Sequence, residues 1–299
     1  MCGIVGLFLK NPALAPSLGD RLSAMLIEMS DRGPDSAGVA FYREPAPPGA
    51  VKLVLFHPDP GFSWLELAER LAAELATEAE LDVRASHART VIAAPYEAIA
   101  AWLALTYPDV RIMSAGGAIE IYKEMGLPED VVERFQLRGI AGSHALGHTR
   151  MATESAVTTE HSHPFSTGLD LCLVHNGSLS NHNRLRRTLS RHGIRFQTDN
   201  DTEVAAGYLT WRMLEGATLA EALEASLADL DGFYTFAVGT SNGFAVLRDP
   251  IACKPAILAE TDDWVAMASE YRAISVLPGA ESARIWEPAP GKVYSWGRA

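Results

Sequence analysis

The sequence predicts an α+β fold in which two sheets pack with helices between or outside them. Short apolar segments separated by turns, which are typical of strands, occur near the start of the chain and again from Gly142 onward. Two helical segments interrupt the later strands. The composition, 48% hydrophobic and 21% charged over 299 residues, is that of a globular chain. Its length suits one large domain or two small ones.

The first elements follow from hydrophobic periodicity. Residues 3–9 are apolar and β-branched, which predicts a buried strand. Residues 17–30 have helical spacing, and the apolar face of this helix is formed by Leu18, Leu22, Met25, Leu26 and Met29. Residues 31–36 are polar and contain Gly and Pro, so we expect a loop there, followed by a strand at residues 39–42.

Residues 43–140 differ in composition and hydrophobic pattern from the residues before and after them, which predicts an insertion. The segment opens with a linker-like cluster of Pro and Gly at residues 45–49. Helical patterns follow at residues 64–81, 95–106 and 128–136. We interpret the insertion as largely helical, with an α/β elaboration as the alternative.

Strand patterns return after Gly142. Apolar segments at residues 169–174, 234–238 and 244–247 predict strands. One helix is expected to open at Asp201 and continue to Leu214, and another to run from Leu219 to Leu230. No internal repeat at a fixed period is present.

Composition excludes several classes of function. The net charge of −12 argues against nucleic acid as a partner, because phosphate contacts need clustered Lys and Arg. No apolar segment approaches the roughly 20 residues that span a bilayer, so we expect no membrane association. The start of the chain has no basic leader or cleavage site, and three cysteines are too few for a disulfide framework. These features predict a cytoplasmic protein, with Cys172 and Cys253 as buried small residues.

Cys2 is the candidate nucleophile. Methionine is usually trimmed when the next residue is small, which would place a thiol and a free α-amine on one residue. The pKa values of an α-amine, roughly 7.7–8.0, and of a Cys thiol, about 8.5, let the amine accept the thiol proton near neutral pH. A buried cysteine at the start of a strand is the alternative interpretation of Cys2 alone.

Five segments in order carry a family resemblance: MCGIVG (1–6), DRGPDSAG (31–38), GHTRMAT (147–153), HNG (175–177) and DNDTE (199–203). Together they resemble the class II glutamine amidotransferases, whose glutaminase domains are N-terminal nucleophile hydrolases. The resemblance implies a four-layer αββα sandwich that covers residues 1–299, with the insertion at about 43–140 outside the match. It also implies hydrolysis of glutamine to glutamate and ammonia.

The resemblance assigns the amino-acid head group of glutamine to two residues. Arg150 would hold the α-carboxylate, because a guanidinium presents two parallel donors that match a carboxylate. A surface ion pair is the alternative for Arg150. Asp201 would bind the α-ammonium and could also cap its helix. Asp199 is a competing candidate for the ammonium site.

The remaining site residues follow from the same motifs. The side-chain amide of Asn176 and the backbone N–H of Gly177 would form the oxyanion hole. A hairpin turn is an alternative interpretation of this Asn-Gly pair, and both can hold. Thr153 and His163 are expected to line the pocket near the carboxylate, and Arg32 to support the loop that carries Cys2.

A cluster of histidines invites comparison with a metal site. The spacing of His161 and His163 would place both rings on one face of a strand. No recognisable zinc pattern accompanies them, so we expect no metal and interpret the cluster as ordinary hydrogen-bonded histidines. Its members are His144, His148, His161, His163 and His175.

The resemblance also suggests partners. Residues 147–159, 231–236 and 248–255, together with the insertion, resemble stand-alone amidotransferase subunits related to glutamate synthase, such as the one that serves N-methylglutamate synthase. The chain is then expected to pass ammonia to a synthase subunit that carries a flavin, and itself to hold no cofactor. The insertion is a candidate docking surface for that partner. Two alternatives remain: a free-standing N-terminal nucleophile hydrolase acting on another amide, and a non-catalytic assembly subunit.

Overall fold

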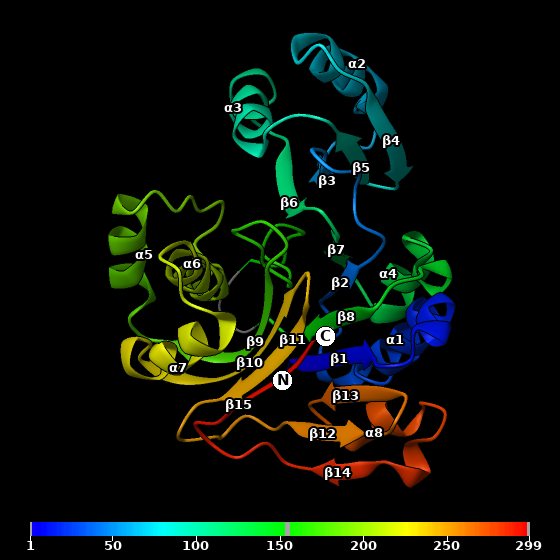
Figure 1. Cartoon of the computed structure of the whole chain (residues 1–299), viewed down its shortest axis with the longest axis vertical. Helices are drawn as coiled ribbons and strands as arrows, with labels where there is room; N and C mark the ends of the chain where they lie inside the picture. The colour runs from blue at the N-terminus through cyan, green and yellow to red at the C-terminus, as the bar shows by residue number, and fades with distance from the viewer. Residues whose placement is uncertain (1, 153–155, 298–299) are drawn as a thin grey trace.

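The computed structural model of the protein describes residues 2–152 and 156–297. Two sheets lie face to face, and helices cover the outer face of each (Figure 1). The layers are helix, sheet, sheet, helix, so the four-layer αββα sandwich is confirmed. The helices lie outside the pair of sheets and not between them, because the facing surfaces of the sheets bury each other's apolar side chains.

The larger sheet contains the N-terminal strand near its middle. All of its neighbouring strands pair antiparallel. In spatial order the strands are β14 (Arg284–Trp286), β12 (Ile257–Glu260), β13 (Trp264–Ala268), β1 (Gly3–Leu9), β8 (His144–Arg150), β2 (Ser36–Tyr42) and β7 (Ile119–Met125). Every residue of β1 is buried, because a layer covers each face of the sheet.

The smaller sheet is also antiparallel and packs on the larger one. Its strands in order are β15 (Val293–Gly297), β11 (Gly243–Arg248), β10 (Gly232–Thr240) and β9 (Cys172–Leu179). The rings of Phe8 and Phe244 meet between the sheets with centroids 6.3 Å apart. Strands β10 and β11 confirm the predicted positions. Strand β9 begins later than predicted, because Leu169 and Asp170 form an exposed turn before it.

Helices cover the outer faces of the two sheets. The larger sheet is covered by α1 (Leu18–Ile27), α4 (Pro128–Arg134) and α8 (Tyr271–Ser275). The smaller sheet is covered by α5 (His182–Arg191), α6 (Asp201–Leu214) and α7 (Leu219–Asp229). The predicted apolar face of the first helix is confirmed, since Leu18, Leu22, Met25, Leu26 and Met29 are all 0% exposed. Short 3-10 helices occupy Pro12–Ser17, Ser30–Arg32, Leu137–Gly139 and Ala280–Ser282.

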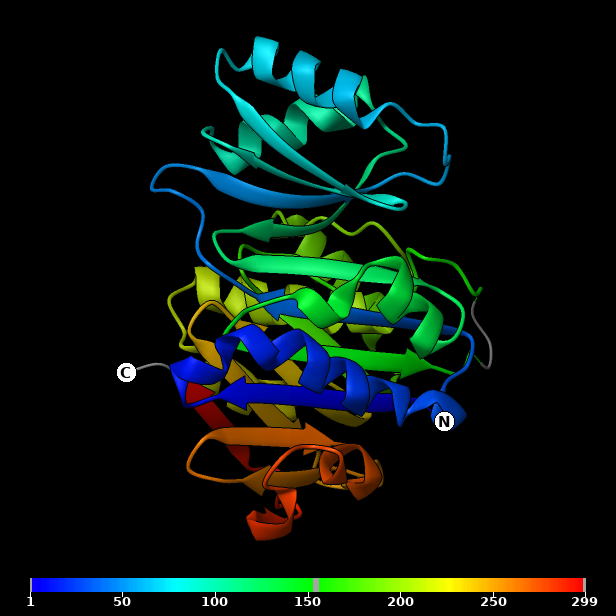
Figure 2. The ribbon, with the colours of Figure 1, turned by 90° about the vertical axis from the view of Figure 1, so that its right-hand side faces the viewer.

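The insertion is not largely helical, and the α/β alternative is the correct one. Its four-stranded antiparallel sheet has the order β4 (Ala79–Arg84), β5 (His87–Ile92), β3 (Val51–Phe56) and β6 (Arg111–Gly116). Helices α2 (Trp64–Glu74) and α3 (Tyr96–Thr106) cover the face of this sheet that points away from the main body (Figure 2). These elements enclose an apolar core of their own.

Two boundaries of the insertion also differ from the prediction. The helix predicted at 64–81 ends at Glu74, because Ala76 takes a left-handed conformation with φ of 49° and the chain then enters edge strand β4. The insertion was expected to continue to residue 140. Strand β7 instead pairs with β2 in the large sheet, and α4 packs beside it.

Asp170 joins the insertion to the main body. Its carboxylate accepts the backbone N–H groups of Gly117, Ala118 and Ile119 at 2.7, 2.8 and 3.0 Å, at the point where β6 passes into β7. A carboxylate that accepts several backbone N–H bonds forms strong, charge-assisted hydrogen bonds. No helix in the described parts of the chain is long and apolar enough to cross a membrane.

Candidate functional site

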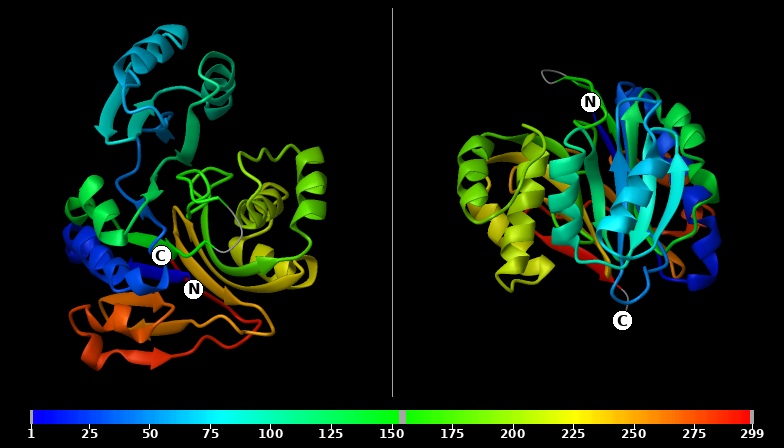
Figure 3. Two further views of the ribbon diagram at one scale, coloured as in Figure 1. Left: turned by 180° about the vertical axis from the view of Figure 1, so that it is seen from behind. Right: turned by 90° about the horizontal axis from the view of Figure 1, so that it is seen from above.

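Cys2 lies at the end of the large sheet, immediately before β1. Register places Gly3 opposite Thr149, and Ser36 opposite Arg150, so the start of β1, the start of β2 and the end of β8 share this edge (Figure 3). The Cys2 thiol is partly exposed, and its Sγ lies 3.8 Å from the carbonyl oxygen of Met151. A cysteine at this position is accessible, unlike one in the middle of β1.

Two side chains hold the backbone of Cys2. Its carbonyl oxygen accepts a hydrogen bond from Arg32 Nε at 3.0 Å and another from Asn176 Nδ2 at 3.1 Å. Arg32 is buried and pairs with Glu270 at 2.5 Å, and this hydrogen bond keeps the pKa of the Glu270 carboxyl below its ordinary value. Glu270 in turn pairs with Arg272 at 2.9 Å. The structure therefore places Arg32 against the residue that it was expected to support.

Asn176 reaches Cys2 from the facing sheet. Its Nδ2 also donates to Ser269 Oγ at 3.2 Å, and the same hydroxyl accepts Ile4 N–H at 2.9 Å. Ser269 thus ties Asn176 to β1 as well as to the end of β13. The amide nitrogen is the donor in both contacts, one to the residue before β1 and one to the residue after β13.

Gly177 follows Asn176 in β9 and cannot be replaced without strain. Its φ is +145°, and a Cβ at this position would lie 1.9 Å from the carbonyl oxygen of Phe233. The Asn-Gly pair is not a hairpin turn, because both residues are paired within the β9–β10 ladder. Only glycine combines this backbone conformation with such close approach of a neighbouring strand.

Arg150 ends β8 beside the thiol and is 5% exposed. Burial lowers the pKa of its guanidinium, while the nearby Cys2, Asp35 and Asp201 favour the charged form. One of its nitrogens donates to the carbonyl oxygen of Ala156 at 3.0 Å. Asp35 supports the adjacent loop by accepting the N–H of Ala152 at 2.8 Å. A charged guanidinium is therefore held close to Cys2.

Asp201 is the first residue of α6 and lies close to the end of β9. Its Oδ2 accepts the N–H of Leu179 at 2.9 Å, and its side chain is 22% exposed. The expectation that Asp201 also caps the helix is wrong, because Asn200 is the N-cap and accepts Thr202 N–H at 2.8 Å. The competing candidate, Asp199, has a side chain 91% exposed and bonds to His161.

Three buried histidines, His148, His163 and His175, lie next to one another close to Thr202. The rings of His148 and His163 stack with centroids 4.0 Å apart, and His175 Nδ1 lies 3.0 Å from Thr202 Oγ1. Burial lowers the pKa of all three, to about 3 for His148. They are therefore neutral near pH 7 and serve as hydrogen-bonding and packing groups. Among the described residues no group of three or more His, Cys, Asp or Glu has the arrangement of a metal site.

His163 lies deeper than expected. It is 7% exposed, and its ring nitrogens contact Thr202 Oγ1 at 3.3 Å and the N–H of His175 at 3.4 Å. The structure thus places its ring against Thr202 and His175, and its expected position near the carboxylate of glutamine stays a prediction. His161 and His163 do not share a strand face, because hydrogen bonds to Thr158 fold this segment into a turn that directs His161 toward Asp199.

The sequence-predicted residues Cys2, Arg32, Asn176, Arg150 and Asp201 therefore meet at one end of the sandwich, and Gly177 adjoins them. Thr153 lies outside the described residues. The expectation that Cys253 is buried is wrong, because Asp249 accepts two N–H groups of the following exposed turn and Cys253 lies in that turn.

Three supporting residues escaped the sequence analysis: Asp35, Ser269 and Glu270. Asp35 lies within the matched segment at 31–38, which was a usable signal. Ser269 and Glu270 follow the apolar segment 264–268, and their only signal is a polar pair at the end of a strand. Their position beside Cys2 depends on the pairing of β13 with β1.

Comparison with known proteins gives concordant matches. The glutamine amidotransferase domain family matches residues 148–276. The glutamine amidotransferase-like protein GlxB of Rhizobium meliloti (strain 1021) is 60% identical over 99% of this chain and 98% of its own length. A putative glutamine amidotransferase of Methanothermobacter thermautotrophicus is 30% identical over 98% of both chains.

A solved structure matches at the level of fold. The glutamine phosphoribosylpyrophosphate amidotransferase of B. subtilis superposes with a TM-score of 0.63 and 21% identity, over 99% of this chain and 47% of that one. This chain thus spans about half the length of the solved protein, and the likeness concerns the fold alone. From its full-length relatives, the chain belongs to the glutamine amidotransferase family.

Proposed function

We propose that this protein is a glutamine amidotransferase subunit that hydrolyses glutamine to glutamate and ammonia through the thiolate of Cys2. The observation that supports the proposal most is the meeting of Asn176 and Cys2, whose side-chain Nδ2 and backbone carbonyl oxygen lie 3.1 Å apart. These residues come from different sheets and are 174 positions apart. Their contact places an amide donor beside an accessible thiol, which is the arrangement that acyl transfer needs.

The proposed reaction begins when the α-amine of the trimmed chain accepts the thiol proton of Cys2. The thiolate attacks the side-chain carbonyl carbon of glutamine, and the C=O π electrons move onto the oxygen. The Gly177 N–H and one N–H of Asn176, which exchanges its contact with Cys2 O or Ser269 Oγ, stabilise that oxyanion. The tetrahedral intermediate collapses, the C–N bond breaks, and the amine returns its proton to the departing ammonia. Water then hydrolyses the γ-glutamyl thioester, which releases glutamate and restores the thiol.

Recognition of glutamine is assigned to two charged groups. Arg150 would bind the α-carboxylate and Asp201 the α-ammonium, since Cys2 and the Asp201 carboxylate both lie close enough to Arg150 to favour its charged form. This pair selects an α-amino acid. An amide of similar side-chain length that lacks the α-carboxylate is therefore expected to be a poor substrate, and comparing the two hydrolysis rates separates glutaminase from a general amidase.

The partner is proposed from the sequence resemblance. Ammonia is soon protonated in water, so a second subunit is expected to consume it. A flavin-bearing, glutamate-synthase-like subunit, as in N-methylglutamate synthase, is the proposed acceptor enzyme in the cytoplasm. Co-purification from the native source and identification of the bound subunits test this part of the proposal.

The central experiment replaces Cys2 with Ala. Only ammonia release from glutamine passes through the thiol, so Cys2→Ala should abolish glutamine hydrolysis and leave any ammonia-dependent activity of the assembled complex intact. Cys253→Ala is the matched control, because Cys253 is an exposed thiol that takes no part in the proposed reaction. Glutamine turnover by the Cys2→Ala variant would refute the mechanism, as would a purified chain that retains Met1 and is active.

A further inference from the structure

Lys123 is a buried charged residue with no role in the reaction above. It lies on β7 and is 3% exposed. Its Nζ donates to the carbonyl oxygens of Glu160, Ser162 and Pro164 at 3.2, 2.7 and 3.2 Å. An ammonium group has three N–H donors and no acceptor. All three donors are therefore used on one short segment of backbone.

The surroundings of Lys123 account for its burial. Its Nζ lies 4.4 Å from the ring centroid of Phe165, so the aromatic face also stabilises the cation. Burial lowers the pKa of Lys123 to about 7, the charges of Glu203 and Glu160 oppose that shift, and Arg150 adds to it. A buried ammonium without partners would be costly. Because all three N–H donors of Lys123 bind carbonyl groups of one backbone segment, we interpret Lys123 as an anchor for that segment.

The anchored segment, residues 160–164, carries His163. A second contact from β7 holds its start, since Thr159 Oγ1 donates to the carboxylate of Glu124. Strand β2 supports the other side, where a Cβ on Gly38 would lie 2.1 Å from the carbonyl oxygen of His163. Contacts with β7 on one side and β2 on the other therefore fix the position of this backbone segment.

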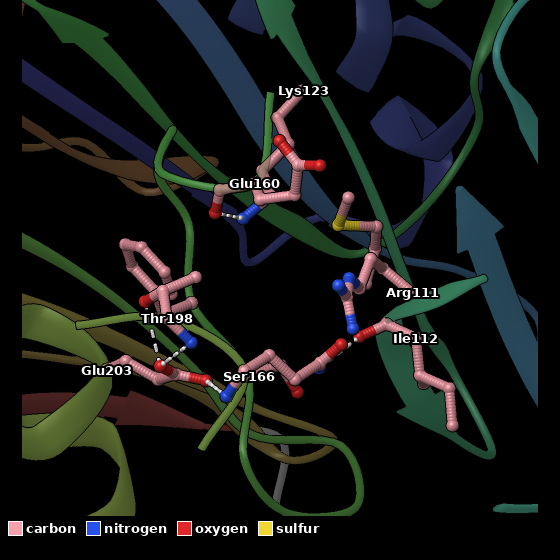
Figure 4. Close-up of a pocket in the computed structure, with 10 residues that line it drawn as sticks. Arg111, Ile112, Lys123, Glu160, Ser166, Thr198 and Glu203 are labelled. Carbon is pink, nitrogen blue, oxygen red and sulfur yellow. Dashed lines mark hydrogen bonds between the residues drawn. The ribbon is translucent and has the colours of Figure 1, made fainter. Parts of the chain in front are cut away.

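The segment leads directly to the proposed glutamine site. His163 contacts Thr202 Oγ1 and the N–H of His175, and these residues adjoin Asp201 and Asn176 in the chain. A small cavity of about 20 Å³, enough for a water molecule, is lined by Lys123 and by Glu203 near the start of α6. Figure 4 shows Lys123 and Glu203 directed toward this cavity from β7 and α6.

We propose that Lys123 is a positioning residue that holds residues 160–164, and through His163 the start of α6, so that Asp201 meets the glutamine head group. This inference rests on the proposed function. The hydrogen bonds of Lys123 go to residues 160–164, and not to Cys2 or to Arg32 and Asn176, which hold it. Its loss should therefore weaken recognition of the amino-acid head group while the reactivity of the thiol is preserved.

The test compares two alkylating reagents on Lys123→Met. 6-Diazo-5-oxo-L-norleucine must occupy the head-group site before it alkylates Cys2, whereas iodoacetamide needs only an accessible thiol. Misplacement of a binding group by about 1 Å can cost up to about 100-fold in rate. We expect alkylation by the diazoketone to slow about 10- to 100-fold, and alkylation by iodoacetamide to stay within about twofold.

Lys52→Met is the matched control. Lys52 is also buried, at 4% exposed, and its Nζ contacts Glu44 O at 3.0 Å and the carboxylate of Glu120, on β7, at 3.1 Å. Its loss removes a buried lysine from the same chain without touching residues 160–164. It should leave both alkylation rates unchanged.

The outcomes separate this inference from the proposed function. Failure of the diazoketone to alkylate Cys2 in the unmodified protein would refute the proposed function before any variant is compared. Wild-type alkylation with an unchanged rate in Lys123→Met, or equal slowing with both reagents, would overturn the role of Lys123. If the Met variant does not fold, Lys123→Gln keeps two of the three donors on a shorter side chain and should show selective slowing of the diazoketone to a smaller extent. Equal effects on both reagents would again overturn the role of Lys123.

Discussion

Replacing Asn176 with Ala should separate catalysis from stability. In the structure Asn176 Nδ2 donates to Cys2 O and to Ser269 Oγ. Both acceptors keep another donor after the substitution, since Arg32 Nε still reaches Cys2 O and Ile4 N still reaches Ser269 Oγ. Neither of these two acceptors is left without a partner. The free energy of unfolding should therefore fall by only about 1–2 kcal/mol.

The effect on the reaction should be much larger. The proposed tetrahedral intermediate loses one of its two oxyanion donors, and removal of such a donor typically costs about 2.7–4 kcal/mol, or about 10²–10³ in kcat. The Gly177 N–H would remain. We therefore expect kcat for glutamate release to fall by about 10²–10³ with a small change in KM.

The assay is glutamate release at saturating glutamine, together with urea denaturation of the same samples. Thr235→Val is the matched control, because Thr235 lies opposite Asn176 on β10, is buried, and donates to Lys254 O at 3.2 Å. It should lose about 1 kcal/mol of stability with kcat nearly unchanged. A kcat for Asn176→Ala within about fivefold of the unmodified protein would refute the oxyanion role, as would an equal loss in Thr235→Val.

Three further predictions concern recognition, the insertion and pH. Arg150→Lys should raise KM for glutamine about tenfold or more, because a point charge replaces a bidentate fork; unchanged KM in steady-state kinetics would contradict this. Asp170→Ala should lower the free energy of unfolding by about 3–5 kcal/mol, since three backbone N–H groups lose a charged acceptor; urea denaturation showing a loss below about 1 kcal/mol would contradict the clamp. The pKa of His148 is lowered from 6.5 to about 3 by burial, so its contribution to stability is complete above pH 6.5 and is lost as pH falls toward 3, by up to about 1.4 kcal/mol per pH unit. His148→Gln should make the unfolding free energy less steeply dependent on pH between 5 and 6.5, and an identical slope would count against the assignment.

The sequence alone indicated the residues that we propose carry the chemistry, and it determined the regular elements with strong periodicity. The wholly apolar segment at residues 3–9 could only be a buried strand, and the face formed by Leu18, Leu22, Met25, Leu26 and Met29 is fully buried as its spacing predicted. The class of fold followed from five short motifs in order. One of these motifs meets a local requirement of the backbone, the positive φ at Gly177.

Elements that depend on distant partners were not visible in the sequence. Strand β4 reads as part of a helix because Ala, Leu and Glu dominate residues 64–81, and only pairing with β5 makes it a strand. The helix α5 is strongly polar, and its apolar face consists only of Leu185 and Leu189, which pack on the core beneath the smaller sheet. Tertiary contacts outweigh local propensity in β4, whereas α5 has too few apolar residues for its pattern to stand out.

The tertiary structure decided how the site is assembled. Ser269 and Glu270 reach Asn176 and Arg32, which hold Cys2, only because β13 pairs with β1. The approach of Asn176 to Cys2 depends on the packing of one sheet on the other. Lys123 lies on a strand whose sequence gives no sign of its role, and its three carbonyl partners are 37 to 41 residues away. Local sequence determines which groups the chain carries, but their distances depend on strand register and sheet packing, which only the folded chain defines.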